Sequence, residues 1–456
     1  MGPALSGADL KSRAMTVIEG NRRGDWTCPS ATLYPHQWLW DSCFIAIGLA
    51  RYDAPRAARE VRALFRGQWS NGMLPHMIFN DRVKDIGSRR IWQSQHNPLA
   101  PRDVETSCVT QPPLAAIAVQ RVADAMSAPD RRMFLAEFFP KLLAYHQWLY
   151  DERDPDSCGL VTLIHPWECG LDTSPPWMRA LARMPLPWWL RAVARLHLAR
   201  VVRGLRNDTR YLPAAQRSSD DEGLRMLVLA TRAKKHHFRL AEMPGRGSVL
   251  IQDLAFNAIL AVANRALALI AEDLQSPLPA ALAQHVERTD AALEELLWDD
   301  AAGEYFSRNA VTGELIAVPT VATFLALWSG VPSPTRASRL IDLLQTRGSF
   351  WPSYPVPSVP IDAADFREAG YWKGPTWVNM NWMICEGLRN YARADLADEL
   401  RARTLALVER SGFSEYFSAL TGDGYGADDF SWTAALVIDL LEAAGPTTDG
   451  LLGGDR

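Results

Sequence analysis

Helical periodicity runs through almost the whole of this 456-residue chain and sets the first limit on its fold. Apolar residues recur at intervals of three and four, the period of one buried face of an α-helix. Strand-like alternation is brief, as at 159–164 and 305–306. The pattern predicts helices whose connections are often short enough for antiparallel neighbours. The expected ranges are 37–50, 55–69, 113–126, 131–152, 178–204, 220–240, 250–272, 277–298, 320–329, 334–345, 375–393, 395–411 and 430–443.

Several of these helices are rich in Ala and Leu on nearly all sides, for example AFNAILAVANRALALIAEDL at 255–274. A helix that is apolar all round must be buried all round. A double ring meets this need, because its inner helices lie between a central funnel and an outer helical layer. An open α-solenoid would show a fixed sequence period instead, and we find none. We therefore predict an all-α fold, an (α/α)6 barrel that forms one domain over 1–456.

The segment 204–248 differs from the rest of the chain. It is dense in charged residues and carries turn-forming residues ahead of an amphipathic helix. Two interpretations are equally supported: an insertion that lies over one rim of the barrel, or a solvated surface excursion. We take 178–248 as the bounds of the predicted rim or cap insertion.

Charge and cysteine usage limit the possible partners and the compartment. The net charge is −4 and the basic residues are scattered, which argues against nucleic acid as a partner. No stretch approaches 18 uninterrupted apolar residues, so no membrane span is expected. The start, MGPALSGADLKSRAM, lacks the apolar core of a signal peptide. The six cysteines lie far apart without a CxxC pair, which predicts reduced thiols and a cytoplasmic setting.

Metal and cofactor motifs are missing from the sequence. There is no HExxH, and His236 and His237 are adjacent, so they point to different sides of any helix. No nucleotide or flavin motif is visible either. We therefore expect neither a metal nor a cofactor.

Tryptophan is abundant, with 17 residues, and many of these lie beside Gly, Pro, Asp or Gln rather than within apolar helices. Sugars need such sites, because their apolar ring faces stack on aromatic planes while their hydroxyls take fixed hydrogen bonds. For any single Trp a core position is the better interpretation, but not for five clusters together. We expect a small sugar as the binding partner and leave a homo-oligomer open. The clusters are YPHQWLWD (34–41), QWSNGMLPHMIF (68–79), HPWECGLDTSPPW (165–177), YWKGPTWVNMNW (371–382) and EYFSALTGDGYGADDFSW (415–432).

Glu168 and Asp172 are the candidate acids of the third cluster, in a Pro- and Gly-rich loop. A carboxyl in an aromatic-lined pocket loses solvation, which raises its pKa and keeps it protonated near neutrality, as a general acid requires. The alternative is that Asp172 caps the helix that begins near Pro176, or makes an Asx turn with Ser174. From the residues alone the two interpretations of Asp172 are equal.

Glu415 lies in a second excursion that is rich in glycine, which lets the backbone approach a ligand closely. Asp429 directly precedes the helix expected from Phe430 and is most simply its N-cap. Glu415 has no helix to cap, so a chemical role is the better interpretation. Inverting hydrolysis of a glycoside needs two carboxyls about 6.5–9.5 Å apart.

Together and in this order, the five clusters resemble glycoside hydrolase family 63, most closely its bacterial branch of mannosylglycerate and glucosylglycerate hydrolases, over about 20–440. The resemblance implies an (α/α)6 barrel and inversion at an α-glycosidic bond, with Asp172 as general acid and Glu415 as general base. It also implies that Asp41 and Gln111 bond sugar hydroxyls and that aromatic residues frame the ring. The implied lining is Tyr34, Trp38, Trp40, Asp41, Gln111, Trp167, Gly170, Tyr371, Trp372 and Trp377, to which we add Trp432.

The rim segment departs from the family pattern. In the glycerate-specific members, a mobile loop of the type QRPTDxxY carries an Arg and a Tyr that hold the glycerate carboxylate. This chain reads QRSSDDEG, so Arg217 is present but Gly223 replaces the Tyr. Arg217 can still pair with a carboxylate in bidentate fashion. The expected substrate is a small glucoside of the glucosylglycerate type, with mannosylglycerate or a neutral α-glucoside as the alternative.

Two other functions remain open on the same fold. Helical toroids also carry sugar epimerases and phosphorylases, and such epimerases depend on histidine pairs. His36, His76 and His165 lie near the clusters but not in convincing pairs. A sugar sensor without activity would keep the pocket, yet the two carboxyls argue against it.

Overall fold

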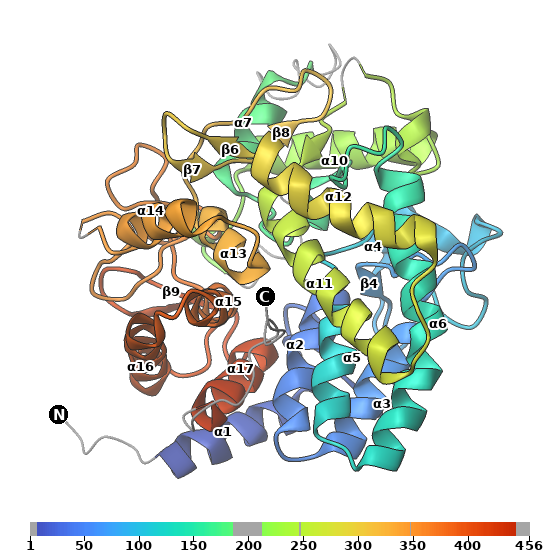
Figure 1. The fold of residues 1–456 in the computed structure, drawn as a ribbon, viewed down its shortest axis with the longest axis horizontal. Coiled ribbons are helices and arrows are strands. Elements are labelled where there is room, and N and C mark those ends of the chain that lie inside the picture. The colour runs from blue at the N-terminus through green and yellow to red at the C-terminus, as the bar shows by residue number, and fades with distance from the viewer. Residues whose placement is uncertain (1–6, 186–211, 246–247, 347, 444–456) are drawn as a thin grey trace.

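A closed ring of helices forms the centre of the computed structural model, which describes residues 7–185, 212–245, 248–346 and 348–443 (Figure 1). Within these residues, each inner helix packs against the next, and the last returns to the first. Their side chains are buried on nearly every side, as the sequence predicted. The ring consists of α2 (Leu39–Ala50), α5 (Ala115–Asp124), α11 (Leu254–Asp273), α13 (Ala322–Ser329), α15 (Val378–Asn390) and α17 (Ser431–Glu442).

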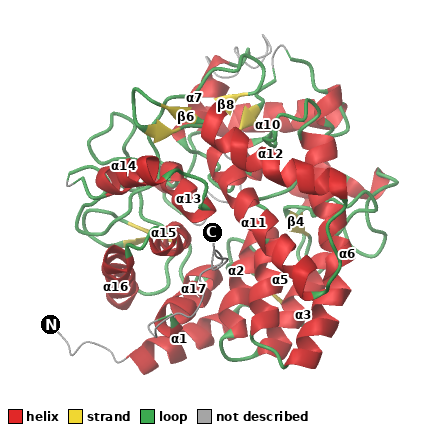
Figure 2. Cartoon of the chain, in the orientation of Figure 1, coloured by secondary structure: helices red, strands yellow, loops and turns green. Residues whose placement is uncertain are grey.

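A second layer of helices covers the ring and alternates with it along the chain (Figure 2). These helices are amphipathic in the expected way: α3, for example, buries Ala57, Val61 and Leu64 against α2. The predicted (α/α)6 barrel is therefore confirmed. The outer layer consists of α1 (Gly7–Gly20), α3 (Ala54–Phe65), α6 (Ala128–Arg153), α12 (Ala280–Leu296), α14 (Pro334–Leu344) and α16 (Ala394–Ser411).

Helix α11 shows why the apolar sequence requires the ring. It is long and apolar enough to cross a membrane by length and composition, but 83% of that window is buried inside the protein. It contacts α5 and α13 in the ring and α6 and α12 in the outer layer. Asp253 caps its first turn by accepting a hydrogen bond from the backbone N–H of Phe256.

Short antiparallel strand pairs occupy the loops between helices. The described pairs are β1–β2, β3–β4, β5–β8, β6–β7 and β9–β10. The alternation expected at 305–306 is found as a strand at Tyr305, whereas 159–164 contributes only one bridge, between Leu163 and Ile251. The strands are β1 (Arg22–Arg23), β2 (Trp26–Thr27), β3 (Gln37–Trp38), β4 (Met77–Ile78), β5 (Ile251–Gln252), β6 (Trp298–Asp299), β7 (Glu304–Tyr305), β8 (Arg308–Asn309), β9 (Tyr416–Phe417) and β10 (Gly424–Tyr425).

The helix predictions hold for the barrel to within a few residues at each end, with differences elsewhere. Helices α1 and α4 (Ile86–Trp92) were not predicted. The helix expected at 178–204 is α7 (Pro175–Arg183), and the part of that range beyond residue 185 lies outside the described residues. The helix expected at 220–240 is α10 (Asp220–Lys235) and ends earlier. Single 3-10 turns complete the described helices: η1 (Ser94–His96), η2 (Pro166–Glu168), η4 (Ala214–Gln216) and η5 (Leu240–Glu242).

The N-cap predicted for the last inner helix is wrong. Helix α17 begins at Ser431 and its N-cap residue is Phe430, without a side-chain hydrogen bond. Asp429 is exposed and has a left-handed backbone with φ of 49°. Its carbonyl oxygen accepts a hydrogen bond from Asn21 Nδ2 at 2.7 Å, so the turn is held by its backbone and not by its carboxylate.

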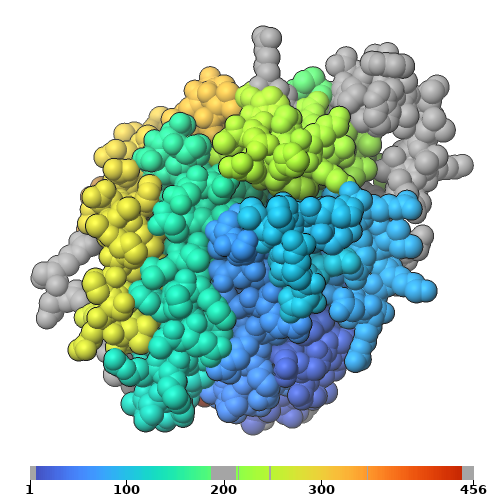
Figure 3. Space-filling model, turned by 90° about the vertical axis from the view of Figure 1, so that its right-hand side faces the viewer, coloured from blue at the N-terminus to red at the C-terminus, as the bar shows by residue number. Residues whose placement is uncertain are grey.

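Helix α10 lies on the barrel and packs against α7 and α4. In Figure 3 the yellow-green segment that contains it rests on the light-blue loops near residue 100. Its residues Leu229 and Ala233 are buried, and its Arg225 donates hydrogen bonds to the carbonyls of Leu181 and Met184. These contacts hold α10 against α7 and the residues that follow it. The insertion over 178–248 as a unit remains a prediction.

Candidate active site

One end of the ring gathers the predicted site residues. Because inner and outer helices alternate, the inner helices run in the same direction and their N-termini meet at one end. Trp40 and Asp41 begin α2, Trp377 is the N-cap residue of α15, and Trp432 lies in the first turn of α17. Gln111 lies in the segment that precedes α5. Three of the five tryptophan clusters, 34–41, 371–382 and 415–432, therefore contain the starts of inner helices, which share one end of the barrel.

Glu415 is a buried carboxylate at this end that accepts hydrogen bonds on both of its oxygens. Its side chain is buried, and its residue is 1% exposed. Oε1 accepts a hydrogen bond from the Tyr34 hydroxyl at 2.9 Å. Oε2 accepts from Arg217 at 3.1 Å and from the backbone N–H of Ala427 at 3.0 Å. The three donors to this carboxylate are a phenol hydroxyl, a guanidinium and a backbone N–H.

The hairpin of β9 and β10 fixes Glu415 in place. The backbone N–H of Glu415 donates to the carbonyl of Ala427 at 2.8 Å, and the N–H of Ala427 donates back to the Glu415 carboxylate. Two hydrogen bonds therefore join these residues. Gly426 has a left-handed φ of 76°, and a Cβ atom there would lie 2.5 Å from Glu415 Oε2. A glycine is required at this position because both the backbone and the carboxylate exclude a side chain.

Gly426→Ala is accordingly expected to reduce activity strongly while costing about 1–3 kcal/mol of folding free energy, because it combines strain at positive φ with a clash. The measurement is kcat/KM alongside thermal unfolding. Gly412→Ala is the matched control, since Gly412 also has positive φ, 78°, but has open space around its Cβ position. A Gly426→Ala variant no less active than Gly412→Ala would contradict this role.

Asp172 differs from Glu415 in its surroundings. Burial raises its pKa to about 7, the positive charge of Arg217 opposes this rise, and the negative charge of Glu415 adds to it. The capping alternative is not realised: the N-cap residue of α7 is Ser174, and its backbone N–H donates to the carbonyl of Leu171. Asp172 therefore has the environment expected of a carboxyl that keeps its proton near neutrality.

Arg217 joins the two carboxyls to the aromatic residues. Its guanidinium lies 4.8 Å from the centre of the Tyr371 ring and 5.5 Å from that of Tyr34, within cation–π range. It also donates a hydrogen bond of 2.5 Å to the Tyr34 hydroxyl. The rim arginine thus contacts Glu415 directly.

The loop that carries Arg217 is held to the barrel on both sides. The Tyr416 hydroxyl donates to the carbonyl of Gln216 at 2.7 Å, and Gly426 N–H donates to its Oε1 at 3.2 Å. Lys373 forms an ion pair with Glu222 in the first turn of α10. Gly223 lies within that same turn, so the position that is Tyr in the family loop is helical here.

A wall of aromatic rings lies beside these charges. Trp372 stacks on Trp377 with ring centres 3.7 Å apart and planes at 2°, and Tyr416 lies 4.6 Å from Trp377. Trp432 meets Trp40 edge to face at 5.1 Å, and Trp38 meets the Tyr34 ring edge to face at 6.0 Å. Among the described residues, the buried indole N–H groups of three of these residues have no hydrogen-bond partner: Trp38, Trp372 and Trp432.

The remaining predicted residues are placed less uniformly. Asp41 is buried, which raises its pKa well above the usual value, and the charge of Glu415 adds to the rise. Gln111 Oε1 accepts from the backbone N–H of Trp40 at 3.2 Å. Gly170 lies against Trp40, since a Cβ there would be 2.6 Å from the indole. Trp167 lies at the edge of the site, where it contacts Trp92 and His165.

Sequence reasoning missed two features of the site, Tyr416 and the backbone N–H of Ala427. Tyr416 holds the rim loop and faces Arg217, although only its place beside Glu415 pointed to it. The N–H of Ala427 has no sequence signal. Glu168, the second candidate acid from the sequence, is fully buried and forms an ion pair with Arg153. Within the described residues, no group of three or more His, Cys, Asp or Glu is placed to hold a metal ion.

Comparison with known proteins gives consistent matches along almost the whole chain. The family model of the mannosylglycerate hydrolase MGH1-like glycoside hydrolase domain matches residues 34–433. The chain is 40% identical to a mannosylglycerate hydrolase of Thermus thermophilus, over 93% of this chain and 99% of that protein. It is 32% identical to a glucosylglycerate hydrolase of Mycolicibacterium hassiacum, over 96% of this chain and 99% of that protein. A crystal structure of the GH63 mannosylglycerate hydrolase from a second strain of Thermus thermophilus, with Tris and D-glycerate, matches with a TM-score of 0.84 and 39% identity, over 95% of this chain and all of that one.

Proposed function

This chain belongs to glycoside hydrolase family 63, and from that premise we propose that it cleaves the α-glycosidic bond of a glycosylglycerate with inversion. Asp172 is the general acid and Glu415 the general base. Mannosylglycerate is the first candidate substrate, because the relative that is 40% identical bears that name. Glucosylglycerate is the second, supported by the relative that is 32% identical.

The observation that carries this proposal is the contrast between two neighbouring carboxyls. Burial raises the pKa of Asp172 to about 7, so that it holds a proton. Glu415 accepts three hydrogen bonds, one of them from the guanidinium of Arg217. Two carboxyls in surroundings that differ in this way can divide the roles of acid and base between them.

The reaction then needs only groups that the chain supplies. Asp172 gives its proton to the glycosidic oxygen as the bond to the anomeric carbon breaks. Glu415 takes a proton from a water that attacks the opposite face, which gives the inverted sugar. The three unpartnered indole N–H groups can donate to sugar hydroxyls, and the stacked pair Trp372 and Trp377 can cover a ring face. In this scheme Arg217 leaves Glu415 and pairs with the glycerate carboxylate.

The test is a substrate panel with the products followed by proton NMR. The panel comprises mannosylglycerate, glucosylglycerate, glucosylglycerol, kojibiose and trehalose. We expect turnover of a glycosylglycerate with the β-anomer as the first sugar product. Release of the α-anomer would contradict inversion, an epimerase would release no aglycone, and failure on every substrate would contradict the proposal. Preference for glucosylglycerol over glucosylglycerate would contradict the role of Arg217.

A basic limb in the pH profile is expected from Asp172. A general acid must be protonated, and kcat/KM reports the free enzyme, so activity should fall roughly tenfold per pH unit above about pH 7. Measurement of kcat/KM from pH 4 to pH 9 checks this. Arg217→Met removes a charge that lowers the pKa of Asp172, so its limb should lie at higher pH. A decline that starts below pH 5 would contradict the assignment.

A further inference from the structure

Glu168 is the most enclosed acidic group near the site, and the proposed reaction does not use it. The residue is 0% exposed and its partner Arg153 is 1% exposed. Arg153 approaches in bidentate fashion, with hydrogen bonds of 2.7 Å to Oε1 and 3.1 Å to Oε2. Oε2 also accepts from the backbone N–H of Ile164 at 2.8 Å, and Oε1 from that of Thr110 at 3.4 Å. Every described partner of this carboxylate is a donor.

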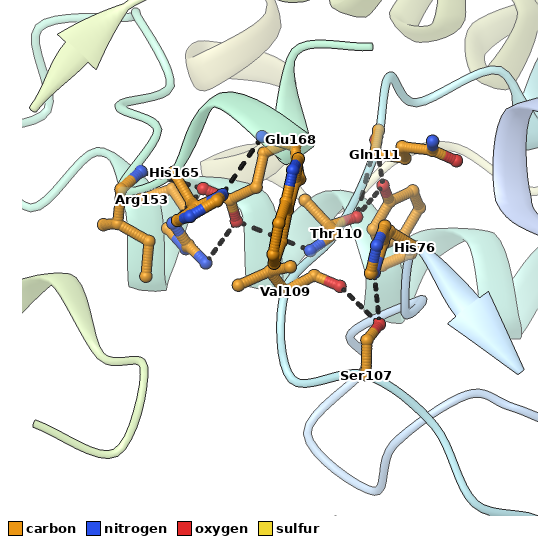
Figure 4. Close-up of polar contacts among 11 residues, drawn as sticks. His76, Ser107, Val109, Thr110, Gln111, Arg153, His165 and Glu168 are labelled. Atoms are coloured by element: carbon orange, nitrogen blue, oxygen red, sulfur yellow. Dashed lines mark hydrogen bonds and ion pairs between the residues drawn. The ribbon is translucent and has the colours of Figure 1, made fainter. Parts of the chain in front are cut away.

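These bonds join three separate parts of the chain (Figure 4). Arg153 is the last residue of the outer helix α6. Thr110 immediately precedes Gln111, which is a proposed ligand of a sugar hydroxyl. Ile164 begins the loop that contains Glu168 itself and ends at Asp172. The carboxylate therefore bridges the acid-bearing loop and the Gln111 segment, and α6 anchors both.

Neighbouring contacts make the loop a rigid connection between Glu168 and Asp172. Residues Pro166–Glu168 form a 3-10 turn, and His165 Nδ1 accepts from the backbone N–H of Trp167 at 3.2 Å. Gly170 lies against the Trp40 ring without room for a Cβ. A shift of Glu168 is transmitted to Asp172 because only three residues separate them and Gly170 cannot move toward Trp40.

Stability alone does not account for this arrangement. A buried ion pair costs both charges their solvation, and apolar residues of the same volume are often equally stabilising. Placement of a functional group is a better reason to keep such a pair, because a fully bonded network defines one geometry. The donors from Thr110 and Ile164 also require an acceptor that apolar residues cannot provide.

We propose that Glu168 is a positioning residue for hydrolysis, whose carboxylate, clamped by Arg153, sets the place of the Asp172 carboxyl relative to Gln111. The inference rests on the proposed function, because it concerns the acid of that reaction. Glu168 itself neither donates nor accepts the transferred proton. Removal of the Glu168 carboxylate should therefore change both the surroundings of Asp172 and the contact of Gln111 with the sugar.

Glu168→Gln tests this because it keeps the shape but turns one acceptor into a donor that faces other donors. We expect kcat/KM to fall at least tenfold per folded molecule and the basic limb of its pH profile to move below that of the wild type. The limb moves in this direction because a loosened loop admits water to Asp172, whose pKa is raised by burial. The other groups that face Asp172, namely Glu415, Arg217, Asp41, Tyr371 and Cys169, are unchanged in this variant.

Glu386→Gln is the matched control. Glu386 pairs with Arg121 at 2.7 Å between the inner helices α15 and α5, near the ends of those helices that lie away from the site. The Glu386→Gln substitution should leave kcat/KM per folded molecule and the basic limb of the pH profile unchanged. The proposal would be overturned if the kcat/KM of Glu168→Gln lay within twofold of the wild-type value and the basic limb of its pH profile were unshifted. If Glu168→Gln does not fold, Glu168→Asp, which keeps the charge and shortens the reach, must show the same shift of the limb.

Amide hydrogen exchange separates a failure of this inference from a failure of the proposed function. Glu168→Gln should accelerate exchange at Thr110 and throughout 164–172, whereas Glu386→Gln should not. If the wild type hydrolyses no substrate, the proposed function fails, and unchanged exchange at 164–172 would overturn the positioning role as well. If the wild type is active, the positioning role is also overturned when Glu168→Gln accelerates amide exchange but leaves the hydrolysis kinetics unaltered.

Discussion

Asp172→Asn is expected to lower kcat/KM by about 10²- to 10⁴-fold, the usual contribution of a general acid. The amide has the shape of the protonated carboxyl but has no proton of suitable acidity to give to the leaving oxygen. The fold should remain intact, because the carboxyl of Asp172 is not required to cap α7. The measurement is steady-state hydrolysis of the preferred glycosylglycerate at pH 6, together with circular dichroism.

The leaving group provides the control that is specific to an acid. An α-glycosyl fluoride expels fluoride without protonation, so Asp172→Asn should lose much less activity on the fluoride than on the glycerate glycoside. Asp428→Asn is the matched substitution, since Asp428 is an exposed acid in the same loop region as Glu415. Equal losses on both substrates would show that Asp172 does not act as the acid.

Stability gives Asp172→Asn a second, independent readout. The folded-state pKa of Asp172, about 7, lies above its ordinary value of 3.8. Its contribution to stability is therefore complete below the unfolded pKa and is lost as pH rises through 7. Asparagine does not ionise, so at pH 8 the variant should unfold at the same temperature as the wild type or higher. A lower unfolding temperature at pH 8 would mean that the ionised carboxylate is stabilising.

Glu415→Ala is expected to lower hydrolysis by about 10²- to 10⁴-fold because no group remains to activate water. It should also destabilise the fold by about 3–5 kcal/mol, because Arg217 is buried and loses its anionic partner. The measurements are kcat and denaturant unfolding. Glu415→Gln keeps most of the shape of the side chain and should be as inactive as Glu415→Ala.

Azide distinguishes a lost base from a damaged site. In Glu415→Ala, the space left by the carboxylate admits a small anion that attacks without a base. Added azide should therefore restore sugar release and yield a β-glycosyl azide, with the configuration inverted. Asp172→Asn lacks the acid instead, and azide should not rescue it on the glycerate glycoside. An α-configured azide product would contradict the assignment of Glu415.

The architecture could be predicted from the sequence because a helix that is buried on both sides needs apolar residues all round, and this composition is visible in the sequence. Helices such as α11 are apolar all round, and that composition has few solutions other than an inner ring. Helix ends were less certain because local signals compete. Asp429 has the residue type of an N-cap, but a bond from Asn21 to its carbonyl draws the turn into another conformation.

The sequence indicated which loops carry the candidate residues but not which side chains contact one another. Tryptophans beside glycine and acids identified the loops, and the environment of Asp172 fits the role that the family resemblance implies. The contact between Arg217 and Glu415 spans 198 positions, and nothing local in either segment encodes it. The bidentate pair of Arg153 and Glu168 was not predicted either, because it depends on where the end of helix α6 meets the loop of Glu168 in space.

The seam of the ring bears on how the chain is made. Helix α17 closes the barrel by packing on α2 and α1, and Ser431 bonds to the carbonyls of Cys28 and Pro29, some 400 positions earlier. A ribosome therefore delivers the first inner helix long before its final neighbour. Until the last helix emerges, α2 presents an apolar flank to water, which invites aggregation and binding by chaperones. Glu415 arrives in that same late portion, so the nascent chain gains its proposed base only as the barrel shuts.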